Sequence, residues 1–412
     1  MGHQATYVER MAERHLAAVM EVQPVAVLMG ARQTGKSTLV RHASGLERHQ
    51  YLTLDSLDVR AQALSDPEAL VGRASRLILD EVQRAPDLLI AIKAAVDAGA
   101  RAPGQFVLTG SADLLAMKQV KETLAGRASY ITLWPLTRRE RLGYGTAGCW
   151  SELLATPVAD WPGLLEAQDV AAEDWRLLAG RSAYPPVALA GLSPSQQADW
   201  LQGYLDTYIG RDIPELSQVS RPLDLLRLMR AAATQVGQVE HQVTWTRLTG
   251  VSRPTASRWA DLLEVSYQLI RIPAFSRNRG KRLTKSPKVY WSDTAMALHL
   301  AAAAEPTGHH LENLVLTDLE CWRWSQSQRP AVMHWRTVDQ LEVDFVVEMP
   351  TGRLLPIEVK AAHRPGWSDV PGLHAFISEY GDLTAGGLVL HGGSDTYRIS
   401  DRIVATPWWR VV

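Results

Sequence analysis

The chain has 412 residues, 46% of them hydrophobic, and a formal net charge of −1. A chain of this length exceeds one ordinary domain, so we expect about two or three. The near-zero net charge excludes nucleic-acid binding through overall charge and leaves only a local basic patch. The two cysteines, Cys149 and Cys321, match no metal-ligand spacing, which favours a reducing compartment without disulfides. No apolar run approaches a membrane span and the first residues lack the apolar core of a secretory signal, so we expect a cytoplasmic protein with no membrane partner.

The first elements expected along the chain are a helix, a strand and a second helix. Apolar residues at helical spacing in residues 5–20 predict an amphipathic helix. The apolar run 25–29, bounded by proline and glycine, predicts a buried strand, and residues 36–43 predict the helix after it. A strand followed by a helix is the context that a phosphate-binding loop requires.

Residues 30–38 join that strand to that helix and contain the full pattern G-x-x-x-x-G-K-S. Glycines let the backbone curl around phosphates, Lys36 is expected to reach the outer phosphates, and Ser37 is expected to ligate Mg²⁺. The sequence therefore predicts ATP and Mg²⁺ as cofactors. The predicted nucleotide-binding residues are Gly30, Ala31, Arg32, Gln33, Thr34, Gly35, Lys36, Ser37 and Thr38.

Residues 77–81 form an apolar run that ends in two carboxylates and predict a second strand of the same sheet. Asp80 at the strand tip is expected to hold Mg²⁺ through its water shell. Glu81 is expected to orient or deprotonate the attacking water. The alternative is a strand that ends in ordinary surface acids.

Residues 105–111 predict a third strand, inserted between the other two, whose end carries small polar residues. Ser111 or Thr109 is expected to act as a polar sensor that contacts the attacking water or the terminal phosphate. Either residue serves equally well as the N-cap of a helix over 112–119.

Arg127 precedes a further predicted strand over 130–133. It is expected either to stabilise transition-state charge or to form a structural salt bridge. The catalytic alternative places it in its own subunit or in a neighbour's, which would make the protein a homo-oligomer. Alternating strands and helices predict an α/β domain with a mostly parallel sheet of the P-loop NTPase kind.

The middle of the chain predicts helices and then a winged helix-turn-helix. Arg211 and Asp212 either couple nucleotide state to the rest of the chain or form an ordinary ion pair near a helix end. In residues 243–272, a short helix, a turn at Gly250 and a second helix capped by Ser252 match the helix-turn-helix pattern.

A basic segment follows, because residues 271–288 carry seven cationic residues and no acidic one. It predicts a wing that contacts DNA phosphates, whereas the alternative is a winged helix that contacts proteins. The predicted DNA-binding residues are Arg253, Arg258, Arg277, Arg279, Lys281, Arg282 and Lys285.

The last third of the chain contains two alternating segments, 341–348 and 354–360, joined by a turn signal. A hairpin folded about Thr351 places Asp344 opposite Glu358, and two such carboxylates repel unless a cation lies between them. Together with Lys360, and with Glu312 on the preceding helix, they resemble the metal site of restriction-endonuclease-like nucleases. That resemblance implies Mg²⁺ or Mn²⁺ at this site.

Nearly the whole chain resembles bacterial and archaeal AAA-type ATPases that carry a C-terminal domain of unknown function. The resemblance rests on GARQTGKSTLV, LILDEVQRAP, FVLTGSADLL and LAGR, and then on YLDTYIGRDIPELS, GVSRPTASRWADLLE, KSPKVYWSDTAMALHL, LEVDFVVE and IEVKA. It implies that the first third binds the nucleotide. Residues 183–187, Ala-Tyr-Pro-Pro-Val, depart from the Gly-Gly-Tyr-Pro-Glu that is usual in that family.

The sequence therefore predicts an ATPase that couples its nucleotide state to DNA through a winged helix and a nuclease-like domain. Two alternatives remain at this stage: an ATP-regulated, metal-dependent DNA nuclease, and an ATP-dependent signalling switch that binds proteins only. The expected domains are an ATPase domain at 1–145, a helical lid or linker at 146–235, a winged helix at 236–300 and a nuclease-like domain at 301–412.

Overall fold

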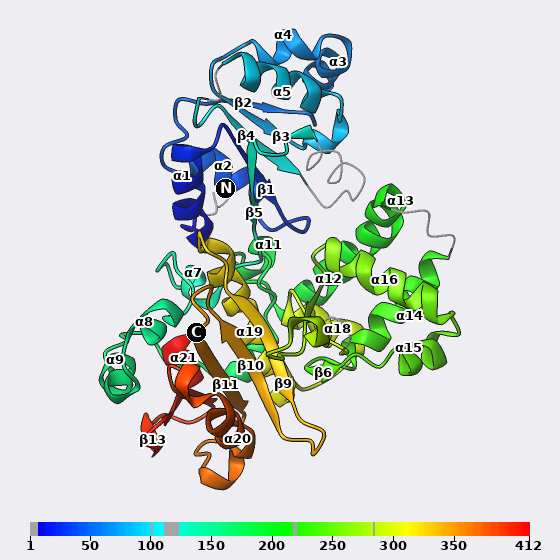
Figure 1. Cartoon of the computed structure of the whole chain (residues 1–412). Coiled ribbons are helices and arrows are strands. Elements are labelled where there is room, and N and C mark those ends of the chain that lie inside the picture. The colour runs from blue at the N-terminus through cyan, green and yellow to red at the C-terminus, as the bar shows by residue number, and fades with distance from the viewer. Residues whose placement is uncertain (1–6, 100–101, 111–122, 217–220, 283–284) are drawn as a thin grey trace.

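A computed structural model of the chain describes residues 7–99, 102–110, 123–216, 221–282 and 285–412. Figure 1 shows three bodies: an N-terminal α/β body in blue and cyan, a largely helical body in green, and a yellow-to-red body built on a second large sheet. Each body contains one sheet, and these have five, three and six strands in chain order.

The N-terminal sheet is parallel throughout and has the strand order β2-β3-β4-β1-β5. It confirms the predicted α/β fold and the insertion of the third predicted strand, β4, between β1 and β3. Every residue of β1 is buried, as its continuous apolar sequence requires. The strands are β1 Val25–Met29, β2 Gln50–Thr53, β3 Leu77–Asp80, β4 Phe106–Gly110 and β5 Ala128–Thr132. The helices between them are α2 Lys36–His42, α3 Leu57–Ser65, α4 Pro67–Val71 and α5 Leu88–Ala98.

The first helix, α1, spans Met11–Val22 and therefore begins later than the predicted range 5–20. Its start is set by Arg10, whose backbone N–H donates to the carboxylate of Glu13 at 2.7 Å. The Arg10 guanidinium donates to the carbonyl oxygens of Thr34 at 2.9 Å and Trp134 at 2.7 Å. These bonds hold the segment before α1 against the phosphate loop in a non-helical conformation.

The helical region that follows packs around buried tryptophan and tyrosine side chains. Its helix α12 continues without a break into a π-helical turn over Tyr208–Asp212. Such turns are frequent at functional positions. The helices are α7 Arg138–Arg141, α8 Trp150–Ala155, α9 Trp161–Glu166, α10 Trp175–Ala179, α11 Pro185–Ala188, α12 Pro194–Thr207, α13 Ile213–Leu216 and α14 Pro222–Ala233.

Two helices joined by a short turn occupy the predicted segment: α15 ends at Gly250, which has φ 73°, and the Ser252 side chain caps α16. Ala256 and Trp259 of α16 are buried, and so are its two leucines near the end. A small antiparallel sheet of order β6-β8-β7 packs beside these helices. The elements are β6 Gln238–Val239, α15 Gln242–Thr249, α16 Arg253–Val265, β7 Leu269–Ile272, α17 Arg279–Arg282, β8 Lys288–Trp291 and α18 Thr294–Ala301.

The C-terminal sheet has the order β13-β14-β12-β11-β10-β9 and mixes parallel and antiparallel pairs. In the β10–β11 hairpin Phe345 pairs with Ile357, and one further step of this register sets Asp344 against Glu358, as the turn at Thr351 predicted. The elements are α19 Gly308–Ser325, β9 Ala331–Arg336, β10 Glu342–Glu348, β11 Leu354–Lys360, α20 Pro371–Tyr380, β12 Gly387–His391, β13 Tyr397–Ser400, β14 Ile403–Pro407 and α21 Trp408–Val411.

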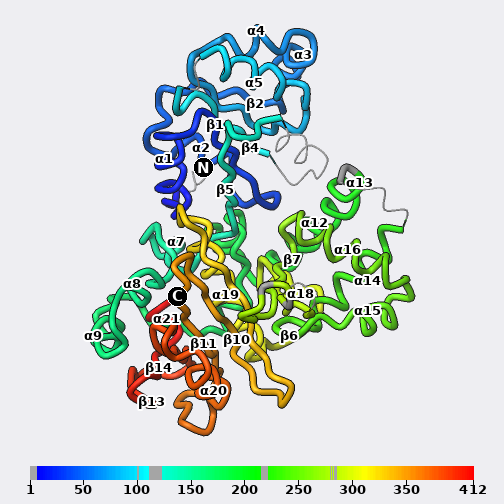
Figure 2. The backbone as a smooth tube through the Cα atoms, in the orientation of Figure 1, coloured from blue at the N-terminus to red at the C-terminus, as the bar shows by residue number. Residues whose placement is uncertain are grey.

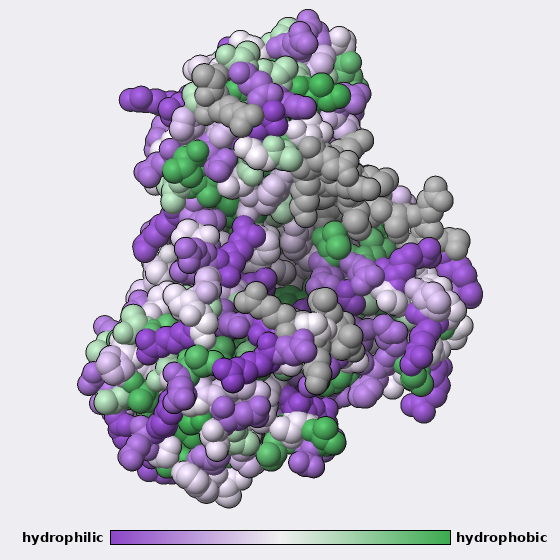
Figure 3. Space-filling view, viewed as in Figure 1, coloured by the Kyte–Doolittle hydropathy of each residue, from purple (hydrophilic) through white to green (hydrophobic). Residues whose placement is uncertain are grey.

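Helix α19 connects the bodies, because it packs against α1 and β5 of the first body and against β11 of the last. The backbone trace in Figure 2 shows this helix at the centre of the molecule, between the blue body and the orange one. The face seen in Figure 3 is largely hydrophilic, with apolar residues in small separate groups. Among the described helices, none has the length and apolar character needed to cross a bilayer.

Candidate functional site

The phosphate loop follows β1 and leads into α2, and its backbone requires glycine at two positions. A Cβ atom on Gly30 would lie 2.3 Å from the carbonyl oxygen of Leu133, and Gly35 adopts φ 92°. Ala31 and Thr34 are buried under the loop, where the Thr34 hydroxyl donates to the Ala31 carbonyl at 3.0 Å. The sequence between strand and helix therefore folds into the predicted cradle.

Lys36 is buried in this cradle, with 6% of its surface exposed. Its Nζ donates to the carbonyl oxygens of Gly30 at 3.1 Å and Ala31 at 2.8 Å. Burial lowers the pKa of Lys36 to about 8, although the nearby carboxylates of Glu81 and Asp80 act in the opposite direction. The ammonium thus lies at the loop in a position where phosphate oxygens would replace backbone carbonyls as its partners.

Ser37 and Asp80, the two predicted Mg²⁺ ligands, are neighbours in space. Ser37 Oγ donates to Asp80 Oδ1 at 3.0 Å, and Tyr51 donates to Asp80 Oδ2 at 2.6 Å. The Thr109 hydroxyl also donates to Asp80 Oδ1. A hydroxyl and a carboxylate at the tip of adjacent elements are the oxygen donors that Mg²⁺ prefers, so this part of the site fits the ion.

Glu81 follows the end of β3 in a left-handed conformation, with φ 62°. Its backbone N–H donates to Thr109 Oγ1 at 3.3 Å, and its carboxylate accepts a hydrogen bond from the Gln83 amide. Thr109 therefore supports both predicted acidic residues from the neighbouring strand β4. Ser111, the other predicted sensor, lies outside the described residues, as does the helix predicted over 112–119.

A cavity of about 710 Å³ lies over the phosphate loop, within the usual range for small-molecule sites, about 300–1,000 Å³. Arg32, Gln33 and the loop residues from Gly35 to Thr38 line it. The remaining lining residues come from four separate segments: Asp55, Arg60, Glu81, Gln83, Arg84 and Arg211. Of these, the sequence predicted Glu81 at the nucleotide site and named Arg211 as a candidate for coupling nucleotide state to the rest of the chain.

Asp212 and Arg211 connect the helical region to this cavity. Arg32 of the phosphate loop donates to both carboxylate oxygens of Asp212, at 3.0 Å and 2.5 Å. The sequence left open an ion pair near a helix end, and the structure pairs Asp212 across 180 positions of sequence. The π-helical turn Tyr208–Asp212 places Arg211 in the cavity wall.

A smaller apolar cavity of about 180 Å³ adjoins the same loop and shares Gly35 and Thr38 with it. Its apolar walls come from the segment before α1, from Leu136 and from α11, which begins in the segment that departs from the family pattern. These wall residues are Tyr7, Val8, Leu136, Pro185, Pro186 and Leu189. The departing segment therefore contributes two prolines to a surface beside the phosphate loop.

Arg127 directly precedes β5, at the opposite end of the parallel strands from the phosphate loop. Ala128, which follows it, pairs with Val25 at the start of β1, whereas the loop leaves the other end of β1. Arg127 forms a two-pronged ion pair with Asp97, at 2.8 Å for each contact. This geometry corresponds to the predicted salt bridge and does not bring Arg127 to its own chain's phosphate loop.

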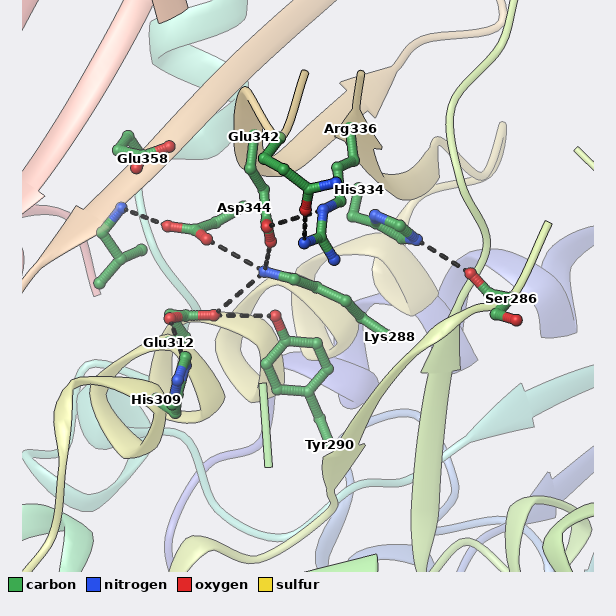
Figure 4. A network of polar contacts seen from close by, with 12 residues as sticks. Ser286, Lys288, Tyr290, His309, Glu312, His334, Arg336, Glu342, Asp344 and Glu358 are labelled. Atoms are coloured by element: carbon green, nitrogen blue, oxygen red, sulfur yellow. Dashed lines mark hydrogen bonds and ion pairs between the residues drawn. The ribbon is translucent and has the colours of Figure 1, made fainter. Parts of the chain in front are cut away.

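The C-terminal acidic residues do meet, and each is nearly buried, with 6% exposure for Glu312 and 7% for Asp344 and Glu358. Figure 4 shows that Lys288, from β8 of the small sheet, points between Glu312 and Asp344. The sequence assigned Lys288 to the basic wing and missed it here. The one signal in the sequence was that Lys288 and Tyr290 are two residues apart in an apolar strand, so their side chains share a face, and Tyr290 is buried.

A metal ion does not fit this cluster, because the carboxylate oxygens of Asp344 and Glu312 that would ligate it are engaged. Asp344 Oδ1 accepts from Lys288 at 3.1 Å and Oδ2 from the Val359 N–H at 2.9 Å. Glu312 contacts His309 at 2.9 Å and accepts from Tyr290 at 3.1 Å. No group of three acidic, histidine or cysteine side chains in the described residues is arranged to hold a metal.

The remaining predicted member, Glu358, accepts a hydrogen bond from Lys360 at 2.7 Å through one oxygen. Its other oxygen has no hydrogen-bond partner among the described residues. Burial and, next, the charge of Asp344 raise the pKa of Glu358 to about 8, while Lys360 acts in the opposite direction. Burial and the charge of Asp344 also raise the pKa of Glu312.

The cations of α16 and of the basic segment divide into those that are exposed and those that form ion pairs. Arg253, Arg258, Arg277 and Lys285 are exposed. Arg282 was predicted to contact DNA, but its guanidinium lies 2.5 Å from the Glu348 carboxylate and its side chain is 14% exposed. The side chains of Arg279 and Lys281 lie outside the described residues. Arg271, also counted in the segment, pairs with Asp261 and Glu264, each at 2.5 Å.

Comparisons with known proteins divide the chain into three parts. Residues 22–142 match the family described as an AAA domain. Residues 172–307 and 307–411 match two domains of unknown function, DUF8612 and DUF4143. An uncharacterised protein of Mycobacterium tuberculosis and one of Mycobacterium bovis are each 28% identical over 410 residues, 97% of this chain and 83% of theirs. The Walker-type ATPase of Pyrococcus abyssi aligns with a TM-score of 0.42 and 16% identity, over 72% of this chain and 97% of its own.

The family match coincides with the five-stranded sheet and the phosphate loop, both of which lie within residues 22–142. The first third of this chain is thus similar to AAA-type ATPase domains and contains a phosphate loop.

Proposed function

We propose that the protein binds ATP with Mg²⁺ and hydrolyses it at the phosphate loop. The observation that carries this proposal is the cavity of about 710 Å³ at that loop, in which Lys36 and Ser37 adjoin the Asp80–Glu81 pair. Cationic side chains outnumber acidic ones in its wall, which suits a ligand as negatively charged as a triphosphate. The cavity beside Gly35 has mostly apolar walls, which suit the adenine base of ATP.

Each residue has a distinct role in this proposal. Lys36 exchanges its bonds to loop carbonyls for bonds to the outer phosphates, and Ser37 and Asp80 would hold Mg²⁺. When bound, that ion supplies charge neutralisation between the phosphates. Glu81, held by Gln83 and by Thr109, orients and deprotonates the attacking water. The water oxygen bonds to the terminal phosphorus while the bond between that phosphorus and the bridging oxygen breaks.

The ATPase proposal is tested by replacing the loop lysine. Lys36→Ala should abolish ATP hydrolysis, because the variant has no positive charge at the outer phosphates. Lys93→Ala, an exposed lysine on α5, removes the same charge away from the cavity and should hydrolyse ATP at the wild-type rate. A Lys36→Ala protein with wild-type turnover would remove this mechanism.

The nucleotide site is coupled, in this proposal, to the helical region through the π-helical turn. Arg32 and Asp212 form an ion pair between the phosphate loop and that turn, and the neighbouring Arg211 lies in the cavity wall. A triphosphate in the cavity adds negative charge next to both arginines. Its binding and release therefore shift the balance of contacts on the turn, into which α12 leads directly.

The output of this coupling is DNA engagement through α16 and the exposed part of the basic segment. Arg253 and Arg258 are exposed on α16, the second helix of the helix-turn-helix, and Arg277 and Lys285 are exposed after it. Exposed cations on and beside such a helix supply the phosphate contacts that DNA-binding modules use. The ion pair of Arg282 with Glu348 removes one of the predicted residues from this surface.

A paired substitution tests DNA engagement. Arg253→Gln combined with Arg258→Gln should weaken binding of a labelled duplex and lower the dependence of affinity on salt, by about 0.9 in log–log slope for each phosphate that the variant no longer neutralises. Arg14→Gln combined with Arg48→Gln removes the same charge from exposed positions of the ATPase domain and should leave binding unchanged. Equal binding by the two double variants would contradict DNA engagement. ATP turnover measured with and without DNA then tests the coupling.

A further inference from the structure

Lys288 reaches the carboxylate cluster from a different part of the chain than the cluster's acidic residues. It begins strand β8, within the residues that match DUF8612, whereas Glu312, Asp344 and Glu358 lie within the residues that match DUF4143. In Figure 4 the lysine side chain extends from the small sheet into the space between α19 and β10. The contact therefore joins two regions that are recognised as separate families.

The ammonium of Lys288 has an acidic partner for each of its three N–H groups. Its Nζ lies 2.5 Å from Glu342, 3.1 Å from Asp344 and 3.5 Å from Glu312. Only 2% of the residue is exposed, so water does not take the place of any of these partners. Burial opposes the charge on Lys288, but the surrounding acidic groups outweigh burial and hold its pKa well above its ordinary value.

The ammonium contacts two of the three carboxylates, Glu312 and Asp344, that the nuclease-like pattern assigns to a metal. Two carboxylates that face one another across β10 and β11 need a cation nearby, and Lys288 is in direct contact with Asp344. Lys360 contacts Glu358 on the other side of the pair. These two lysines, with Arg336 at 3.8 Å from Glu342, nearly balance the four carboxylates.

We propose that Lys288 replaces the divalent cation of this site, so that the cluster is a metal-free charge cluster that fastens the small sheet to the C-terminal sheet. In this arrangement the cluster neither binds Mg²⁺ or Mn²⁺ nor hydrolyses phosphodiesters. Removal of the ammonium frees oxygens of Glu312 and Asp344 beside the unpartnered oxygen of Glu358. The vacated position then becomes a divalent-cation site.

The test counts Mn²⁺ bound per chain in the absence of nucleotide, by electron paramagnetic resonance of the free ion. Wild type, Asp344→Asn and Glu358→Gln should bind the same amount. Lys288→Ala should bind one additional Mn²⁺, which the further substitution Asp344→Asn removes. Lys285→Ala, an exposed lysine three positions away, is the matched control and should bind as wild type does.

Two results would overturn the proposal: a Mn²⁺ ion in the wild type that Asp344→Asn or Glu358→Gln removes, or a folded Lys288→Ala protein that binds no additional Mn²⁺. Cleavage of plasmid DNA by the wild type but not by Asp344→Asn would also overturn it. If Lys288→Ala does not fold, the comparison of wild type with the two acid variants still decides. None of these measurements depends on ATP, so their outcome is separate from that of the ATPase proposal.

Discussion

The nucleotide cavity and the carboxylate cluster both gather charged side chains, but the charges face different surroundings. At the phosphate loop, cations from several segments line an open volume of about 710 Å³. In the cluster, Lys288 is 2% exposed and all of its N–H groups meet carboxylates of the same chain. Charges that line a cavity remain available to a ligand, whereas charges compensated inside the protein stabilise the contact between the elements that carry them. The following predictions test this contrast, beginning with the largest effect.

Lys288→Met should lower the free energy of unfolding by about 3–5 kcal/mol, because it leaves buried carboxylates without their cation. Lys285→Met is the matched control, since this lysine is exposed, and it should change stability by less than about 0.5 kcal/mol. Urea unfolding followed by tryptophan fluorescence measures both. Equal midpoints for the two variants would show that Lys288 does not compensate the cluster.

Glu81→Gln should lower the rate of ATP hydrolysis by about 10²-fold or more while ATP still binds, because the amide cannot accept a proton from water. The measurement is steady-state turnover together with the affinity for a labelled ATP analogue. Glu68→Gln, an exposed acid on α4, serves as the control. Turnover by Glu81→Gln within twofold of the control would exclude Glu81 as the base.

Glu358→Gln should stabilise the protein at alkaline pH. The pKa of Glu358 is raised from 4.5 to about 8 in the folded protein, so its stabilising contribution is complete below pH 4.5 and is lost as pH rises toward 8. Glutamine resembles the protonated acid at every pH. The variant should therefore match the wild type near pH 4.5 and exceed it by about 1–3 kcal/mol above pH 8. If the stabilities of the variant and the wild type change in parallel across this range, the pKa of Glu358 is not raised in the folded protein.

ATP affinity should fall above about pH 8, because the free protein then loses the proton of Lys36, whose pKa burial lowers to about 8. Bound triphosphate favours the charged lysine, so the dissociation constant should rise by up to about tenfold per pH unit above that value. Titration of a fluorescent ATP analogue between pH 7 and 9.5 measures it. An affinity that stays constant over this range would mean that Lys36 remains charged in the free protein.

Local patterns predicted the elements whose structure depends on neighbours in sequence. The strand, loop and helix around Lys36 follow from an apolar run, two glycines and a helix start, all contiguous. Asp80 and Ser37 meet because the ends of parallel strands converge on one edge of a sheet. The hairpin register that sets Asp344 against Glu358 follows from a turn signal and the two-residue period of strands.

The tertiary structure alone decided which partner each distant charge has. Lys288 was grouped with a basic wing because its sequence neighbours are basic, yet its partners lie 24 to 56 positions away. Arg211 lies in the wall of the nucleotide cavity, and Asp212 pairs with Arg32. Arg127 lies at the end of the parallel strands that is far from the phosphate loop. Residue types and periodicity determine which face of an element is buried, but the opposing charge comes from whichever element packs there. That arrangement results from the packing of the whole chain, which no local pattern encodes.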